Sequence, residues 1–135
     1  MIVTGGAGFI GSHIVDALVA RGDEVHVVDN YAGGKYPERL NTKATYHELD
    51  VRATDELQKI LQGVDTVFHL AALPRVAYSV EHPVETTDNN ITGTVSVLTA
   101  AARAEVRRVV YSASGSAYGE QTVMPLVETM ETNPV

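Results

Sequence analysis

Three glycines spaced three residues apart near the start of the chain constrain the fold more than any other feature. Gly5, Gly8 and Gly11 follow the apolar pair Ile2-Val3, and an apolar periodic segment comes after them. This order is typical of a strand, a tight turn and a helix. Glycine permits the turn's backbone angles, leaves no Cβ atom in the way of a diphosphate, and lets helix and strand pack closely. Unpaired amides in the first helical turn would then attract an anion.

The following strand supplies the context that a glycine triplet lacks. Residues 25–28 form a valine-rich strand that ends in Asp29-Asn30, and the acid comes about 20 residues after the turn, as in dinucleotide-binding proteins. A carboxylate at this point can accept hydrogen bonds from both ribose hydroxyls of an adenosine and repels a 2′-phosphate. The pattern therefore predicts a site for NAD rather than NADP. The alternative, a solvated loop acid, stays open.

The rest of the chain alternates between helical and strand-like segments. We expect helices over residues 8–21, 55–61 and 84–104, and strands over 25–28, 44–49, 64–70 and 107–112 besides the first. Gly22 and Gly63 should end helices, Thr54 should cap one, and Pro83 should begin the long one after a connection over 73–82. Ile91, Val95, Leu98 and Ala102 form the apolar stripe of that long helix, which we expect to belong to the core, with a dimer face as the alternative.

These elements predict an α/β fold, a Rossmann-like doubly wound parallel sheet of about five strands in the order 3-2-1-4-5. Ligands of such sheets bind at the carboxyl ends of the strands, where the order reverses between strands one and four. The glycine turn, Asp29, Asp50, Ala71-Ala72 and residues 112–114 fall at these ends and should converge on one crevice.

The composition argues against several classes of function. The 135 residues carry a formal net charge of -7, whereas a nucleic-acid partner requires a basic face. The chain has no cysteine for a disulfide or thiolate site, and its five histidines have no metal-ligand spacing. No apolar run approaches the ~20 residues of a membrane span, and no signal peptide precedes the first strand. We expect one cytoplasmic domain over residues 1–135.

Six short motifs point to a family. They cover residues 4–11, 29–30, 50–51, 69–72, 89–94 and 112–119. In this order they resemble the extended short-chain dehydrogenase/reductases, specifically the NAD-dependent nucleotide-sugar epimerases of the UDP-glucose 4-epimerase type. The stretches over 73–83 and 112–128 are most similar to UDP-N-acetylglucosamine 4-epimerases. The resemblance covers essentially the whole chain, and six motifs in register are far more specific than one.

The resemblance implies a role for each matching residue. The expected cofactor-binding residues are Gly5, Gly8, Phe9, Ile10 and Gly11 for the diphosphate, Asp29 and Asn30 for the ribose, Asp50 and Val51 for the adenine, and Leu70, Ala71, Ala72 and Asn89 toward the nicotinamide, with Pro74 and Ser112 also bordering NAD. Ser114 matches the catalytic serine, whose hydroxyl hydrogen-bonds the sugar C4 oxygen. In such enzymes a tyrosine beside a lysine takes the hydroxyl proton while hydride moves to NAD and back. The substrate of the full-length protein would be a UDP-sugar.

The chain departs from the family in one respect that matters for activity. The Tyr-x-x-x-Lys motif expected after Ser114 is missing, because Tyr111 and Tyr118 have no lysine four residues on and the last lysine is Lys59. We therefore expect the N-terminal portion of an epimerase, without its C-terminal substrate domain, that binds NAD at most. Such a portion would leave apolar side chains of the first, fourth and fifth strands open, which favours a homodimer or higher oligomer.

A few single residues bear on other possible functions. Gly115-Ser116 follow Ser114 where dehydratases carry an Asp-Glu pair, and the glutamate of related decarboxylases is absent too. A non-catalytic NAD-binding sensor or interaction module, or another extended short-chain reductase, remains an alternative. His69 is more readily a capping or core residue than a catalytic one. Arg75 is equally consistent with a phosphate contact and with a solvated side chain.

Overall fold

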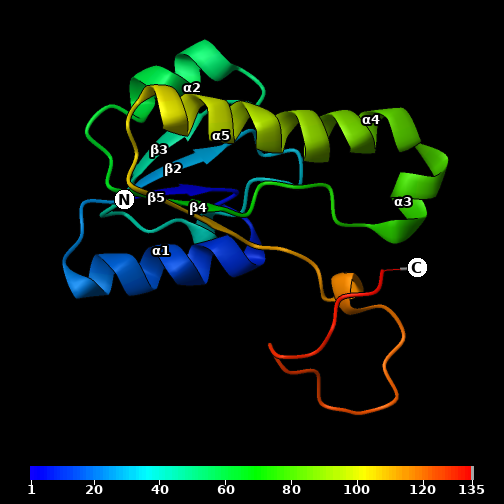
Figure 1. Ribbon diagram of the computed structural model, residues 1–135. Coiled ribbons are helices and arrows are strands. Elements are labelled where there is room, and N and C mark those ends of the chain that lie inside the picture. The colour runs from blue at the N-terminus through cyan, green and yellow to red at the C-terminus, as the bar shows by residue number, and fades with distance from the viewer. Residues whose placement is uncertain (135) are drawn as a thin grey trace.

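Five parallel strands form a single sheet in the computed structural model, which describes residues 1–134 (Figure 1). The strands are β1 (Ile2–Thr4), β2 (His26–Asp29), β3 (Thr45–Glu48), β4 (Thr66–His69) and β5 (Arg108–Tyr111). Their order is β3-β2-β1-β4-β5, so the predicted 3-2-1-4-5 order is confirmed. The order reverses between β1 and β4, and the carboxyl ends of both strands lie at the same edge of the sheet.

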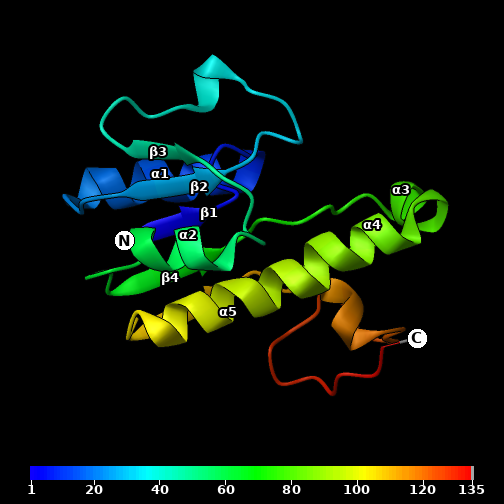
Figure 2. The same cartoon turned by 90° about the horizontal axis from the view of Figure 1, so that it is seen from above.

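Helices cover both faces of this sheet. Helix α1 (Phe9–Arg21) lies on one face, and α2 (Thr54–Ile60) and α5 (Gly93–Arg103) lie on the other (Figures 1 and 2). Gly22 ends α1 as predicted, because its φ of 94° lets its amide reach the carbonyl oxygens of Leu18 and Val19. The layers are those of a Rossmann-like fold.

The core consists of two apolar clusters, one on each face of the sheet. Val3 and Val27 pack under α1 with Val15, while Ile2 and Val28 pack under α2 and α5. All five side chains have no exposed surface. The central strands are covered on both faces, which is why each reads as a continuous apolar pair rather than as an alternating pattern.

The helical segment before β5 differs from the prediction. The expected connection over 73–82 contains α3 (Val76–Glu81), and the expected helix over 84–104 is divided into α4 (Pro83–Thr87), a π-helical turn η2 (Asp88–Thr92) and α5. Pro83 does begin α4, as predicted. The wider π turn has no signature in apolar periodicity, and such turns are frequent at functional sites.

The apolar stripe predicted for this helix faces outward, which corrects the sequence analysis. Ile91, Val95 and Leu98 are about half exposed or more, at 62, 57 and 48%. The buried face of α5 consists instead of Gly93, Ser96, Val97, Ala100 and Ala101. At Gly93 the packing is close, because a Cβ there would lie 3.0 Å from Cγ2 of Val51. The buried face of α5 thus consists of small residues that allow close packing, rather than of the larger apolar ones.

Two smaller predictions about helix ends were wrong. Ala53, not Thr54, is the N-cap of α2, and the Thr54 hydroxyl lies 2.7 Å from that of Ser96, which joins α2 to α5. Helix α2 ends at Ile60, before Gly63, which adopts a φ of 74° in the turn that follows.

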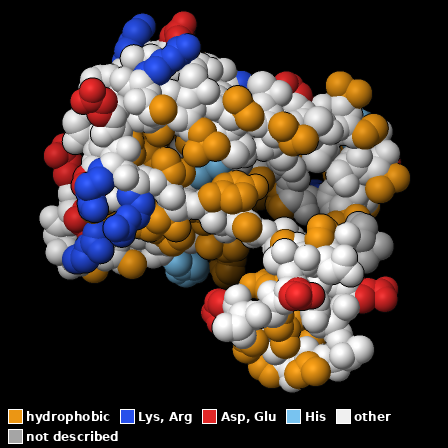
Figure 3. Space-filling model, viewed as in Figure 1, with side chains coloured by type: hydrophobic (Ala, Val, Ile, Leu, Met, Phe, Trp, Pro, Cys, Tyr) orange, Lys and Arg blue, Asp and Glu red, His pale blue; other side chains and the backbone are white. Residues whose placement is uncertain are grey.

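An apolar groove runs beside α1, where we expected an open face. It has a volume of about 480 Å³ and is lined by Phe9, Ile10, His13, Ile14, Ala17, Leu18, Arg21 and Phe68. Val110 of β5 is also 42% exposed, but Ile2 and Val3 are buried, so the first strand is covered and that part of the expectation was wrong. Hydrophobic side chains gather between α5 and α1 in the space-filling view (Figure 3).

The remaining segments lie outside the sheet. The single turn η1 (Pro37–Arg39) belongs to the loop between β2 and β3, and η3 (Gly115–Tyr118) follows β5. Beyond η3 the chain leaves the sheet without regular structure (Figure 1). Val135, the end of the predicted domain, lies outside the described residues. No helix within residues 1–134 is long and apolar enough to cross a membrane.

Candidate functional site

The glycine turn brings the end of β1 against the end of β4. Gly5 has a φ of 70°, and a Cβ on it would lie 2.7 Å from the amide nitrogen of Ala71. A Cβ on Gly11 would collide with the carbonyl oxygen of Gly5, so the third glycine is required for helix and turn to approach each other. These contacts place the turn at the predicted switch between β1 and β4.

The start of α1 offers unpaired hydrogen-bond donors. Within residues 1–134 the amides of Phe9, Ile10 and Gly11 have no acceptor, although Gly11 is buried. Gly8 caps the helix with extended backbone and no side chain, and no acidic residue lies in the first turn. The donors and the positive end of the helix dipole are therefore free for an anion. This arrangement fits a dinucleotide diphosphate.

Asp29 lies beside these amides and links β2 to the glycine turn. Its Oδ2 accepts the amide of Ala7 at 3.0 Å, and its Oδ1 accepts the amide of Tyr31 at 2.8 Å. Each carboxylate oxygen has about two acceptor positions, so each keeps one for a further donor. The half-buried carboxylate therefore fits the two hydroxyls of a ribose, as the sequence predicts.

A charged cluster continues the site along the ends of β2 and β3. Asn30 donates to Asp50 at 3.1 Å, and Arg52 donates to both oxygens of Asp50. These bonds, chiefly from the Arg52 side chain, lower the pKa of Asp50 to about 2. The Arg52 guanidinium also donates to Asp88 of the π turn, and its own pKa is raised by the two carboxylates. The cluster thus joins the predicted adenine edge to η2.

The second predicted adenine residue is placed differently from the first. The side chain of Val51 is only 5% exposed and belongs to the core cluster under α5. Its backbone amide and carbonyl have no partner within the described part of the chain. Only its backbone is therefore available to a base.

The residues predicted near the nicotinamide follow β4. The amide of Leu70 donates to the Thr4 carbonyl at 3.1 Å, and Ala71 packs on Gly5. Ala72 and Pro74 are exposed. The amide of Ser112 donates to the His69 carbonyl at 3.1 Å, so the β4–β5 pairing extends to the predicted serine.

His69 is buried in a hydrogen-bonded chain behind these residues. Its Nδ1 lies 2.6 Å from the Thr4 hydroxyl and its Nε2 lies 3.1 Å from the Thr94 hydroxyl. Because Thr94 donates its own proton to the carbonyl of Asn90, it must accept from Nε2–H, and Nδ1 accepts from Thr4. The imidazole is neutral in this arrangement, and burial lowers its pKa. The geometry supports the predicted core role.

The π turn carries one predicted residue and one that sequence reasoning missed. Asn89 is half-buried on η2. Asn90 accepts the Leu73 amide at 2.8 Å and donates to the Leu73 carbonyl at 3.1 Å, so it holds the segment after β4 against the helix. The only local sign of this clamp is the unfavourable Asn-Asn pair in mid-helix.

Ser114, the predicted catalytic residue, is exposed at the N-cap of η3. Its Oγ accepts the amide of Ser116 at 3.1 Å, which leaves the hydroxyl proton free to be donated. Arg75 is exposed at the start of α3, and Tyr118 is half-buried. No described contact joins Ser114 to the glycine turn, so this part of the predicted convergence stays a prediction.

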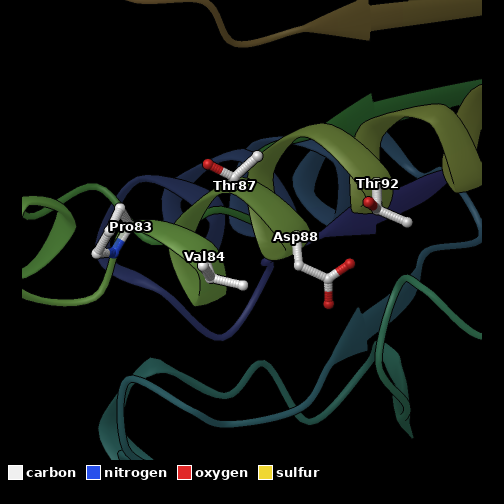
Figure 4. Close-up of a pocket in the computed structure, with 5 residues that line it drawn as sticks. All are labelled: Pro83, Val84, Thr87, Asp88 and Thr92. Carbon is white, nitrogen blue, oxygen red and sulfur yellow. The ribbon is translucent and has the colours of Figure 1, made fainter.

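A shallow groove of about 370 Å³ lies apart from the glycine turn. It runs along α4 and η2 and is lined by Pro83, Val84, Thr87, Asp88 and Thr92 (Figure 4). None of the predicted cofactor-binding residues lines it. Within residues 1–134 no group of three or more His, Asp or Glu side chains could hold a metal ion.

Comparison of the sequence with known proteins agrees with this geometry. Residues 1–135 match the profile of the NAD dependent epimerase/dehydratase family. A putative UDP-glucose 4-epimerase of Methanocaldococcus jannaschii is 39% identical over the whole chain, which spans 45% of that relative. A UDP-glucose 4-epimerase of Klebsiella pneumoniae is 39% identical over 96% of the chain and 99% of the relative. UDP-glucuronic acid decarboxylase 4 of Arabidopsis thaliana is 38% identical over the whole chain and 30% of the relative.

Solved structures share the fold. UDP-glucose 4-epimerase of Thermotoga maritima with UDP-glucose superposes with a TM-score of 0.89 and 40% identity over 99% of this chain and 44% of the other. The UDP-glucose 4-epimerase of Thermus thermophilus in complex with NAD gives a TM-score of 0.88 and 37% identity over 98% of this chain and 44% of the other. The chain thus spans less than half the length of most of these proteins.

Proposed function

Because the chain belongs to the NAD dependent epimerase/dehydratase family, we propose that it is the N-terminal NAD-binding portion of a nucleotide-sugar 4-epimerase. The observation that carries the proposal is the set of three unpaired amides at the start of α1, beside the free acceptor positions of Asp29. One set of groups suits a diphosphate and the other suits a ribose, and the fold places them together.

Sequence identity alone does not distinguish the epimerases of the family from its decarboxylases. The Arabidopsis decarboxylase and the Methanocaldococcus epimerase are 38 and 39% identical to the chain. The loop after β5 supports the epimerase, because Gly115-Ser116 follow Ser114 and neither can transfer a proton as a carboxyl group does. Another extended short-chain reductase would instead oxidise NADH in net terms.

The residues of the chain would bind and orient rather than react. NAD, when bound, supplies a hydride acceptor. The amides of Phe9, Ile10 and Gly11 would hold its diphosphate, and Asp29 would hold the adenosine ribose. Ser114 has a free hydroxyl proton and would donate a hydrogen bond to the C4 oxygen of a UDP-sugar. The sugar nucleotide itself would bind to the longer protein.

We propose that the 135 residues bind NAD without turnover. Proton transfer from the sugar hydroxyl requires a base, and neither Tyr111 nor Tyr118, the tyrosines nearest to Ser114 in the sequence, has a lysine four residues on to lower its pKa. The one such pair, Tyr31 and Lys35, lies in the loop between β2 and β3. The cytoplasm suits a chain without cysteine, since it needs no disulfide there.

Two apolar surfaces support the proposal of a homodimer or higher oligomer. One is the groove beside α1 with Phe9, Ile10 and Phe68. The other is the outer stripe of the α4–α5 segment, where Val84, Ile91 and Val95 are more than half exposed. Sedimentation analysis at high protein concentration tests this, and a strictly monomeric mass would contradict it.

Calorimetric titration with NAD and with NADP tests the function. We expect NAD to bind with one site per chain and NADP to bind at least tenfold more weakly, because Asp29 repels a 2′-phosphate. Equal affinity would refute the role of Asp29, and no heat with either dinucleotide would refute the cofactor site. UDP-galactose added with NAD should give no UDP-glucose.

A further inference from the structure

Two histidine side chains face each other at one edge of the sheet. His26 begins β2, and His47 lies in the edge strand β3, where it pairs with Val28 (Figure 2). Because residues 26 and 28 of one strand point to the same face, the two imidazoles meet across the strands. Nδ1 of His26 lies 3.0 Å from Nε2 of His47. The register of β2 and β3 therefore creates a pair that a separation of 21 residues in the sequence does not reveal.

Glu24 determines which nitrogen of His26 keeps its lone pair. Its Oε1 lies 3.3 Å from Nε2 of His26, and a carboxylate can only accept, so Nε2 carries the proton and Nδ1 is free to accept. Burial, together with the charge of His26, lowers the pKa of His47, which favours the neutral ring there. A carboxylate that orients a histidine through its far nitrogen is the arrangement found behind metal-binding histidines.

The distance between the two facing nitrogens suits two ligands of one metal ion. Metal–imidazole bonds of about 2.0–2.1 Å place two nitrogens about 2.9 Å apart at a right angle and about 3.4 Å apart at the tetrahedral angle. The observed 3.0 Å is closer to the right angle, which is typical of Cu(II) and Ni(II) sites. The ring planes differ by 19° and the His26 side chain is 28% exposed, so the rings can turn toward solvent and direct both lone pairs to one ion.

We propose that His26 and His47 form a binding site for a divalent transition-metal ion, Cu(II) in preference to Zn(II), with Glu24 as the positioning residue behind His26. Two protein ligands leave the other coordination positions to water. The site is separate from the dinucleotide site, because His26 precedes Asp29 by about 10 Å along β2. The inference therefore does not rest on the proposed function. The formal net charge of -7 favours the approach of a cation.

Calorimetric titration of the 135-residue chain with Cu(II) tests the site. We expect one ion per chain with micromolar affinity. His26→Gln and His47→Gln should each weaken binding about tenfold or more, because even substitutions behind a metal ligand cost that much. His13→Gln and His82→Gln remove exposed histidines elsewhere, so these matched controls should keep the wild-type affinity. Equal affinity in the wild type, His26→Gln and His47→Gln would overturn the inference, as would the absence of binding at millimolar Cu(II).

A second pair of variants tests the positioning role of Glu24. Glu24→Gln removes the charge behind His26 and should weaken Cu(II) binding several-fold, with no change in the circular dichroism of the chain. Glu56→Gln removes an exposed carboxylate on α2 and should leave the affinity unchanged. Wild-type affinity in Glu24→Gln would show that the carboxylate does not act on the site.

Electron paramagnetic resonance of the Cu(II)-bound chain gives a result that needs no variant, so a variant that fails to fold leaves the inference testable. The spectrum of the wild type should show hyperfine coupling to two imidazole nitrogens. Coupling to a single imidazole nitrogen would exclude the pair as the site. Titration with Zn(II) should give weaker binding than Cu(II), in line with the general order of affinities. Tighter binding of Zn(II) would refute the right-angle geometry.

Discussion

The hydroxyl of Thr4 lies 2.6 Å from Nδ1 of His69 and donates to it, so that the last residues of the two strands at the switch point share a buried hydrogen bond. The other ring nitrogen donates to Thr94. A second proton on His69 would require Thr4 to accept where it now donates. The hydrogen bonds that join β1, β4 and α5 at this point therefore require the imidazole of His69 to be neutral.

This junction predicts a stability that falls with acid. Burial lowers the pKa of His69 from its ordinary value of 6.5, and burial together with His26 lowers that of His47. Below pH ~6.5 the unfolded chain gains protons that the native state resists, so the free energy of unfolding should be constant above that pH and decrease below it. Urea unfolding followed by circular dichroism between pH ~5 and ~8 measures the slope.

A variant isolates the contribution of His69. We expect His69→Gln to have a smaller slope below pH ~6.5 than the wild type, whatever its absolute stability. His13→Gln, on the exposed side of α1, serves as the matched control and should keep the wild-type slope. An unchanged slope in His69→Gln would show that the ring is not held neutral.

The close packing of the glycine turn predicts that glycine-to-alanine substitutions at Gly11 and Gly115 have very different effects. Gly11→Ala should destabilise the chain by several kcal/mol and abolish NAD binding, because its Cβ would collide with the Gly5 carbonyl. Gly115→Ala should change neither by much, since nothing lies within 4 Å of its Cβ. Thermal unfolding and NAD calorimetry on both variants check the contrast, and a stable Gly11→Ala that binds NAD would contradict the close approach.

Asp29 predicts a change in cofactor preference. Asp29→Asn keeps one acceptor oxygen but loses the negative charge, so NAD should bind about tenfold more weakly while NADP loses less or gains. The measurement is the ratio of the two dissociation constants. Asp55→Asn removes an exposed charge that pairs with Arg103 at 3.3 Å and should leave that ratio unchanged. A parallel loss for both dinucleotides in Asp29→Asn would indicate a structural role only.

The strands and the glycine turn could be predicted from the sequence because each depends on residues close together in the chain, and the sheet order then follows from the alternation of strands and helices. Val27 and Val28 reveal a buried strand, and Gly5, Gly8 and Gly11 reveal a turn, without knowledge of any distant partner. The same holds for Asp29, whose position is fixed by the end of its own strand.

The rest depends on contacts between distant residues. Arg52 meets Asp88 across 36 residues, and Asn90 meets Leu73 across 17, so neither role has a local pattern. The outward face of α5 was predicted to be core because the prediction used the spacing of apolar side chains and took no account of the space available to them. A Cβ on Gly93 would lie 3.0 Å from Cγ2 of Val51, so small residues suit the buried face, and Leu98 lies on the outside.

We expect the neighbouring residues Asn89 and Asn90 to have different roles, Asn89 in NAD binding and Asn90 in the stability of the fold. Asn90→Ala leaves the Leu73 amide and carbonyl without their partners in a half-buried place, which should cost about 1–3 kcal/mol of unfolding free energy. Asn89 makes no side-chain hydrogen bond within residues 1–134, so Asn89→Ala should cost about 0.5 kcal/mol or less. Its expected place is beside the nicotinamide, and its loss should instead weaken NAD binding several-fold. Urea unfolding and NAD calorimetry on both variants measure the two quantities, and the assignment is wrong if Asn89→Ala loses the stability while Asn90→Ala does not.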